Sequence, residues 1–127
     1  MFQMMNSLMI SLMKMNKLII YYIISYNIIG DFFMLKNISV NKLDVNNNII
    51  IDIRDKEKYN TIHIPNSVHI ENDKLLNNPN DYINKEDIYY IYCQHGKTSL
   101  KTCIKLSKLG YNVINIMGGY DEWLIKN

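Results

Sequence analysis

The chain has 127 residues, 48% of them hydrophobic, which is enough for one domain whose core needs no disulfides. Its formal net charge is only +2, and no run of lysines and arginines interleaves with aromatics, so a nucleic-acid-binding surface is excluded. The two cysteines, Cys93 and Cys103, form no CxxC pair and no cluster at zinc spacing. They predict no disulfide framework and no metal site, and they favour free thiols in the cytoplasm.

Residues 1–33 differ in composition from the rest and are predicted to be an N-terminal extension. They hold most of the methionines, and their only charged residues are Lys14, Lys17 and Asp31. The apolar stretch 18–29 is shorter than the ~20 residues of a membrane-spanning helix, and no small-residue cleavage site follows it. Three interpretations stay open: a membrane anchor, a poorly ordered extension, or leader sequence before a start at Met34. The short stretch favours the last two over membrane association.

From Leu35 to the end of the chain, short β-type runs alternate with helical segments. Continuous apolar or β-branched runs predict strands, and amphipathic or polar segments between them predict helices. The predicted strands cover residues 38–40, 49–53, 67–70, 88–92 and 112–116. The predicted helices cover residues 55–59, 72–77, 98–109 and 120–125. This alternation predicts one α/β domain over residues 35–127, with a five-stranded, mainly parallel sheet flanked by helices on both faces.

Cys93 directly follows the predicted central strand, 88–92. Ligands of open parallel sheets bind at the carboxyl ends of the strands. Gly96 lets the next loop curl so that backbone N–H groups surround the sulfur, and the following helix adds its positive dipole end. Such surroundings favour a thiolate, and Lys97 is expected to add positive charge nearby. His95 either adds to that charge or is a neutral, exposed histidine of the loop. Cys93 is therefore the predicted nucleophile, the alternative being an unreactive side chain buried at the end of a strand.

The segment from Cys93 to Ser99 resembles the active-site loop of the rhodaneses, in which six residues from the cysteine form a bowl of backbone amides. Three further motifs of that family follow the same order along the chain. They are Asp52-Ile53-Arg54 with Tyr59-x-x-x-His63-Ile64-Pro65, Leu109-Gly110-Tyr111-x-Val113, and Gly118-Gly119-Tyr120-x-x-Trp123. The resemblance spans residues 38–124 and implies the rhodanese-like fold.

The resemblance also assigns roles to residues of the loop and its surroundings. Cys93 is expected to be catalytic, with Asp52 and Arg54 supporting the site. The expected substrate-binding residues follow the cysteine: Gln94, His95, Gly96, Lys97, Thr98 and Ser99. Two departures affect the expected substrate rather than the nucleophile. Thr98 stands where the family often has arginine, which removes a cationic contact, and Ile62 stands where a glycine usually precedes the histidine.

The family resemblance implies a sulfurtransferase. In that reaction the Cys93 thiolate takes the outer sulfur of thiosulfate or of a persulfide donor, and then passes it to a thiol or to cyanide. No metal or organic cofactor is implied. The expected partners are a small anionic donor such as thiosulfate and a protein persulfide donor or acceptor. The alternative is a persulfide carrier of the same fold that serves a dedicated acceptor protein, with little thiosulfate turnover. A related phosphatase is disfavoured because no arginine in the loop can hold a phosphate.

Several neighbouring residues have structural interpretations. Asp52 either orders the site or forms a local turn with the backbone, and Arg54 is expected to join neighbouring loops by ion pairing. His63 is interpreted as a hydrogen-bonded structural histidine. Cys103 lies on the apolar stripe of its helix and is assigned to the core, the alternative being a resolving thiol. Trp123 is also assigned to the core.

Overall fold

The computed structural model describes residues 16–25 and 35–127. The chain divides into two units at the junction of Met34 and Leu35. In the first unit, helix α2 (Lys17–Ser25) is capped by Asn16, whose Oδ1 accepts a hydrogen bond of 2.9 Å from the Ile19 N–H. None of the helices in these two ranges has the length and apolar character that crossing a membrane requires. The rest of the predicted extension, residues 1–15 and 26–33, lies outside the described residues.

The second unit contains a five-stranded sheet in the order β1-β5-β4-β2-β3, and every neighbouring pair of strands is parallel. The strands are β1 (Lys36–Ile38), β2 (Ile49–Asp52), β3 (Val68–His69), β4 (Ile88–Tyr92) and β5 (Asn112–Ile116). In the register of the sheet, Asp52 at the end of β2 is opposite Tyr92 at the end of β4. The predicted five-stranded parallel sheet with β4 at its centre is confirmed.

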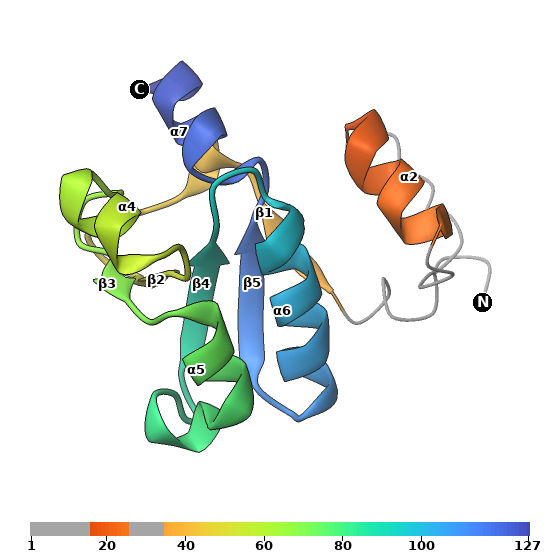
Figure 1. The fold of residues 1–127 in the computed structure, drawn as a ribbon, viewed down its shortest axis with the longest axis vertical. Helices are drawn as coiled ribbons and strands as arrows, with labels where there is room; N and C mark the ends of the chain where they lie inside the picture. The colour runs from red at the N-terminus through yellow and green to blue at the C-terminus, as the bar shows by residue number, and fades with distance from the viewer. Residues whose placement is uncertain (1–15, 26–34) are drawn as a thin grey trace. The chain divides into compact units, whose positions relative to one another are not determined.

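Helices cover both faces of this sheet, as predicted. The helices are α4 (Lys56–Thr61), α5 (Asn72–Asn77), α6 (Lys97–Lys108) and α7 (Gly119–Lys126), with 3-10 turns η1 (Val40–Lys42) and η2 (Pro79–Asp81). On one face α6 packs on β4 and β5 and contacts α5, which lies beside it (Figure 1). On the other face α7 contacts η1 and covers a core built on Tyr92, Ile50 and Ile116.

The side-chain alternation of the strands explains these two layers. Along β4, Tyr90 and Tyr92 pack toward the core that α7 covers, so Ile91 between them must point to the opposite face, where α6 lies. Helix α6 buries its apolar stripe there, including Leu100 and Cys103, which have no exposed surface. Cys93, one residue beyond β4, has the same parity as Ile91. Its side chain is therefore directed to the face where α6 begins.

The first and third strands differ from their predicted ranges. The first strand begins earlier, at Lys36, and Val40 belongs to a 3-10 turn because the Leu43 N–H donates to its carbonyl. The strand predicted over 67–70 is only Val68–His69. Ser67 turns back before it, since its N–H donates to the Ile64 carbonyl.

Candidate active site

The sulfur of Cys93 lies in a cradle of backbone amides at the N-terminus of α6. Its Sγ accepts hydrogen bonds from the N–H groups of Gly96, at 3.1 Å, and Ser99, at 3.3 Å. The Ser99 hydroxyl lies 3.3 Å from the same sulfur. Gly96 is the N-cap residue of α6 and has no side chain to cap it. The sulfur of Cys93 takes that place, because it accepts from the third residue of the helix as a capping side chain does. A thiolate here meets both N–H donors and the positive end of α6.

The loop that carries Cys93 packs closely against the glycine pair Gly118-Gly119. Gly96 adopts a left-handed backbone with φ +94°, and a Cβ on it would lie 2.8 Å from the backbone N of Gly118. At Gly119, also left-handed with φ +61°, a Cβ would lie 2.3 Å from the carbonyl oxygen of Cys93. Both approaches are too close for any side chain. The Gly118-Gly119 motif is therefore explained by direct packing against the loop that carries the cysteine.

A second helix N-terminus converges on the same loop. The first N–H groups of α7 have no partner within their own helix and donate instead to the loop. Tyr120 donates to the Cys93 carbonyl at 2.9 Å, and Asp121 donates to the Gln94 carbonyl at 3.0 Å. The positive ends of α6 and α7 thus both face the residues around Cys93, which favours negative charge there.

A buried ion pair supports the loop from the end of β2. The Arg54 side chain donates through Nε and Nη2 to the Asp52 carboxylate, with distances from 2.7 to 3.1 Å. Asp52 has no exposed surface, and Arg54 is 7% exposed. Asp52 also accepts from the backbone N–H of Arg54 at 2.8 Å, which is the local turn foreseen as its alternative role. Asp52 therefore forms the local turn and is at the same time the ion-pair partner of Arg54, which the sequence had not named.

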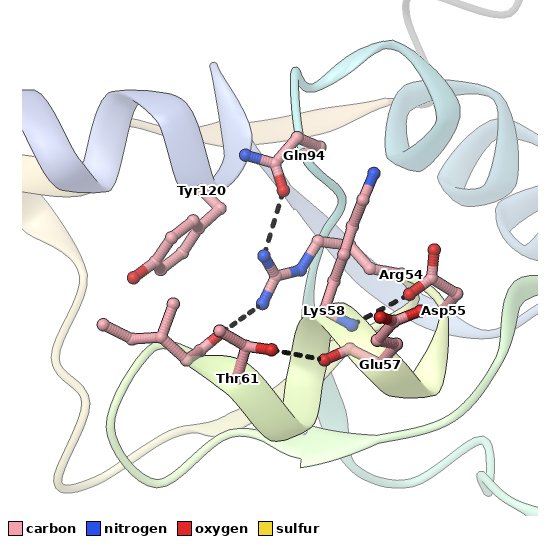
Figure 2. A pocket seen from close by; sticks show the side chains of 8 residues that line it. Arg54, Asp55, Glu57, Lys58, Thr61, Gln94 and Tyr120 are labelled. Carbon is pink, nitrogen blue, oxygen red and sulfur yellow. Dashed lines mark hydrogen bonds between the residues drawn. The ribbon is translucent and has the colours of Figure 1, made fainter.

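Arg54 connects this pair to the residue after the cysteine. Its Nη1 donates to Gln94 Oε1 at 3.0 Å, its Nη2 donates to the Ile62 carbonyl at 2.7 Å, and its guanidinium lies 4.5 Å from the Tyr120 ring (Figure 2). The guanidinium therefore joins β2, the turn after α4, the loop and α7. This is the joining of neighbouring loops that the ion-pairing interpretation predicted.

The predicted loop residue His95 pairs with Asp121, in the first turn of α7. Its Nδ1 contacts Asp121 Oδ2, and Gln94 Nε2 donates to Asp121 Oδ1 at 2.6 Å. Burial acts to raise the pKa of Asp121, but the hydrogen bonds from Gln94 and His95, with the charges of His95 and Lys58, lower it overall. Asp121 therefore stays ionised near neutral pH and holds both side chains.

Comparison with known proteins identifies the family. The family model described as Rhodanese-like domain matches residues 36–126. The chain belongs to the rhodanese-like domain family. A crystal structure of a rhodanese-like domain protein from Staphylococcus aureus superposes with a TM-score of 0.63 at 32% identity, covering 70% of this chain and 91% of that one.

Two curated relatives are named as sulfurtransferases. The adenylyltransferase and sulfurtransferase uba4 of Ogataea parapolymorpha is 32% identical over 75 residues, which are 58% of this chain. The chain spans only 19% of the length of that relative. The thiosulfate sulfurtransferase GlpE of Pseudomonas savastanoi is 30% identical over 79 residues, 59% of this chain and 71% of that protein. The family and these names support sulfur transfer as the general activity of this rhodanese-like domain.

A cleft opens next to Gln94 in the rhodanese-like domain. It has a volume of about 440 Å³ and is bounded by α4, the loop and α7. In Figure 2 the Lys58 side chain extends along one side of the Arg54 guanidinium and the Tyr120 ring lies on the other. Ile62, which replaces the usual glycine, also lines the cleft and is 55% exposed. Within residues 16–25 and 35–127, no cluster of histidine, cysteine and carboxylate side chains could hold a metal ion.

The remaining predicted residues have the following positions. Lys97 and Thr98 are exposed in the first turn of α6, and Ser99 is fully buried behind the sulfur. His63 is partly buried, stacks on Tyr59 at 3.9 Å between ring centroids, and has its Nδ1 2.8 Å from the Tyr59 carbonyl. This agrees with its structural interpretation.

Cys103 is fully buried, and burial, aided by the nearby Cys93, raises the pKa of its thiol. Trp123 is partly buried against the core that α7 covers. Sequence reasoning missed Asp121, although it directly follows the Gly118-Gly119-Tyr120 motif. Its proximity to His95 arises from the fold, since the two residues are 26 positions apart.

Proposed function

We propose that this rhodanese-like domain transfers sulfane sulfur from a small anionic donor such as thiosulfate, or from a persulfide, through a persulfide on Cys93. The observation that supports this most directly is the position of Sγ, which accepts two backbone N–H groups at the N-terminus of α6. These donors favour the thiolate that attacks and later leaves, and they favour an anionic donor that approaches it. The GlpE relative, named a thiosulfate sulfurtransferase, supports thiosulfate as the first donor to test.

The reaction has two displacements. In the first, the Cys93 thiolate attacks the outer sulfur of thiosulfate, a new S–S bond forms, and sulfite leaves with the electrons of the broken bond. In the second, an acceptor nucleophile attacks that outer sulfur, and the Cys93 thiolate leaves. No redox cofactor is required, because each step exchanges one bond to sulfur for another. The two free thiols are compatible with a reducing compartment, and we propose the cytoplasm as the site of the reaction.

Intact-mass measurement tests this proposal. After incubation with thiosulfate and removal of excess reagent, the protein should gain about 32 Da, the mass of one sulfur atom, and lose it again on addition of cyanide. Cys93→Ser should not gain this mass, because a serine hydroxyl is not ionised near neutral pH and forms no persulfide. A mass gain that persists in Cys93→Ser would contradict the assignment of the nucleophile.

The persulfide carrier is the alternative within the same chemistry. Slow turnover of thiosulfate with cyanide, together with rapid sulfur exchange with a protein persulfide, would favour the carrier over the thiosulfate enzyme. Comparison of the two rates on one preparation distinguishes them.

A further inference from the structure

His95 stands apart from the other two histidines of the chain. His63 and His69 are partly buried, and each has a ring nitrogen against a backbone carbonyl, of Tyr59 and Arg54 respectively. The His95 side chain is 72% exposed, lies two residues after the nucleophile, and contacts the Asp121 carboxylate instead. It is therefore a solvent-exposed imidazole close to the nucleophile in sequence, held by a carboxylate.

The contact with Asp121 fixes the tautomer of His95. An ionised carboxylate can only accept hydrogen bonds, so Nδ1 of His95 must be the donor. In the neutral ring the proton is then on Nδ1, and Nε2 carries the free lone pair. Within the described part of the chain, the His95 ring makes its hydrogen bond through Nδ1, to Asp121. Nε2 is left available to a molecule that approaches from solvent.

Asp121 is itself held in place, so that it can orient the ring. Gln94 Nε2 donates to its other oxygen at 2.6 Å, and Gln94 is fixed in turn by Arg54 Nη1 at 3.0 Å. The backbone N–H of Asp121 also donates to the Gln94 carbonyl. An exposed ion pair contributes little to stability, but these contacts hold the Asp121 carboxylate where it can orient the His95 ring.

We propose that His95 is the general base for the sulfur acceptor when that acceptor is a thiol, with Asp121 as its positioning residue. This rests on the proposed function, since it concerns the second displacement. Near neutral pH an ordinary thiol is mostly protonated and must lose its proton to become a nucleophile. Nε2 of His95 takes that proton, and the thiolate then attacks the outer sulfur of the Cys93 persulfide. A bond forms between the two sulfurs, the S–S bond to Sγ breaks, and Sγ leaves as the thiolate that the Gly96 and Ser99 amides hold. The imidazolium of His95 afterwards returns its proton to water.

The test follows the second displacement alone. Cys93 is loaded with one sulfur from inorganic polysulfide, checked by mass, so that the measurement does not depend on thiosulfate as the donor. Discharge is then followed in single turnover with a series of small thiols of increasing pKa and with sulfite, which attacks without losing a proton. The variants are His95→Ala and Asp121→Asn, and the matched control is Glu122→Gln, the next carboxylate on α7.

General base catalysis predicts a loss that depends on the acceptor. For thiols of ordinary pKa, His95→Ala should slow discharge by about 10²-fold, while sulfite and strongly acidic thiols, already ionised, should change by less than about twofold. Asp121→Asn should show a smaller loss with the same dependence on acceptor pKa, because an amide can donate as well as accept and so no longer fixes the ring's orientation or the tautomer with its lone pair on Nε2. Glu122→Gln should discharge to every acceptor as the unchanged protein does.

Two results would overturn the inference. If His95→Ala slows sulfite and thiols equally, His95 only shapes the loop, and if it slows neither, it has no part in the transfer. Failure of the proposed function has a different signature, in which no sulfur is gained from thiosulfate or from polysulfide.

Discussion

The buried pair of Asp52 and Arg54 yields a prediction whose magnitude follows from the structure. Asp52→Asn keeps the shape of the side chain but replaces one acceptor oxygen with an NH₂ group that faces the Arg54 guanidinium. The variant therefore loses the hydrogen bonds to one oxygen and leaves a 7%-exposed cation without its counter-charge. Removing one partner of a buried ion pair costs about 3–5 kcal/mol. A domain of this size has about 5–15 kcal/mol of stability in total, so the loss is a large fraction.

The assay is urea unfolding followed by circular dichroism and by the fluorescence of Trp123, the single tryptophan. A loss of about 3 kcal/mol should also lower the melting temperature by about 12–24 °C. Asp55→Asn is the control, because Asp55 is exposed, accepts one hydrogen bond from the Lys58 N–H as the cap of α4, and asparagine caps about as well. Its cost should stay below about 0.5 kcal/mol. If Asp52→Asn loses less than about 1 kcal/mol, or no more than Asp55→Asn, the pair does not stabilise the domain as argued.

Two further predictions concern the core and the loop. Because Cys103 is fully buried and the pKa of its thiol is raised, iodoacetamide near neutral pH should alkylate only Cys93 in the folded protein. Peptide mapping that finds Cys103 labelled first would contradict this. Cys103→Ser should keep most of the sulfur transfer. Gly119→Ala should reduce sulfur transfer by about tenfold or more, because its Cβ would press on the Cys93 carbonyl at 2.3 Å. Gly110→Ala also has a left-handed φ, of +95°, but its added methyl would make only ordinary van der Waals contact with the Lys85 side chain, at 3.7–3.8 Å. It should cost about 1 kcal/mol of stability and leave the transfer rate unchanged, and equal rates for the two alanine variants would refute the packing argument.

The fold was largely predictable because its signals are local. The apolar run 88–92 and the amphipathic segment 98–109 each carry their own periodicity, and the structure has a strand and a helix at nearly the same bounds. The ranges at the edges of the sheet were less accurate. Val40 belongs to a β-prone run in the sequence, but in the structure it is buried as the first residue of a 3-10 turn. Such a short turn has no hydrophobic periodicity by which the sequence could predict it.

The contacts around the loop were predictable only for residues that lie close together in one sequence motif. Ion pairing by Arg54 was expected, but not its partner Asp52, although the two residues are close in sequence. Its contact with Gln94 joins residues 40 positions apart. The partner of His95 was missed for the same reason. From the loop alone, Lys97 was expected to add charge near the sulfur and His95 either to add to it or to be neutral, but in the structure His95 binds Asp121 of α7. Electrostatic partners on different elements become visible only when the fold brings them together.

The site uses one side chain, that of Arg54, to join its elements, and it uses backbone N–H groups to bind the sulfur. Arg54 is the single arginine, and it stands where one planar group must reach Asp52, the Ile62 carbonyl and Gln94 at once. A lysine ammonium has neither the reach nor the directed fork for three such contacts. Thr98 stands where the rhodanese motif often has arginine, so this position gives the loop no charge. The sulfur still has its donors because they are backbone amides at the start of α6. The backbone can therefore supply hydrogen-bond donors to the sulfur without a cationic side chain at position 98, provided that glycines at 96 and 119 let the two helix ends approach the loop.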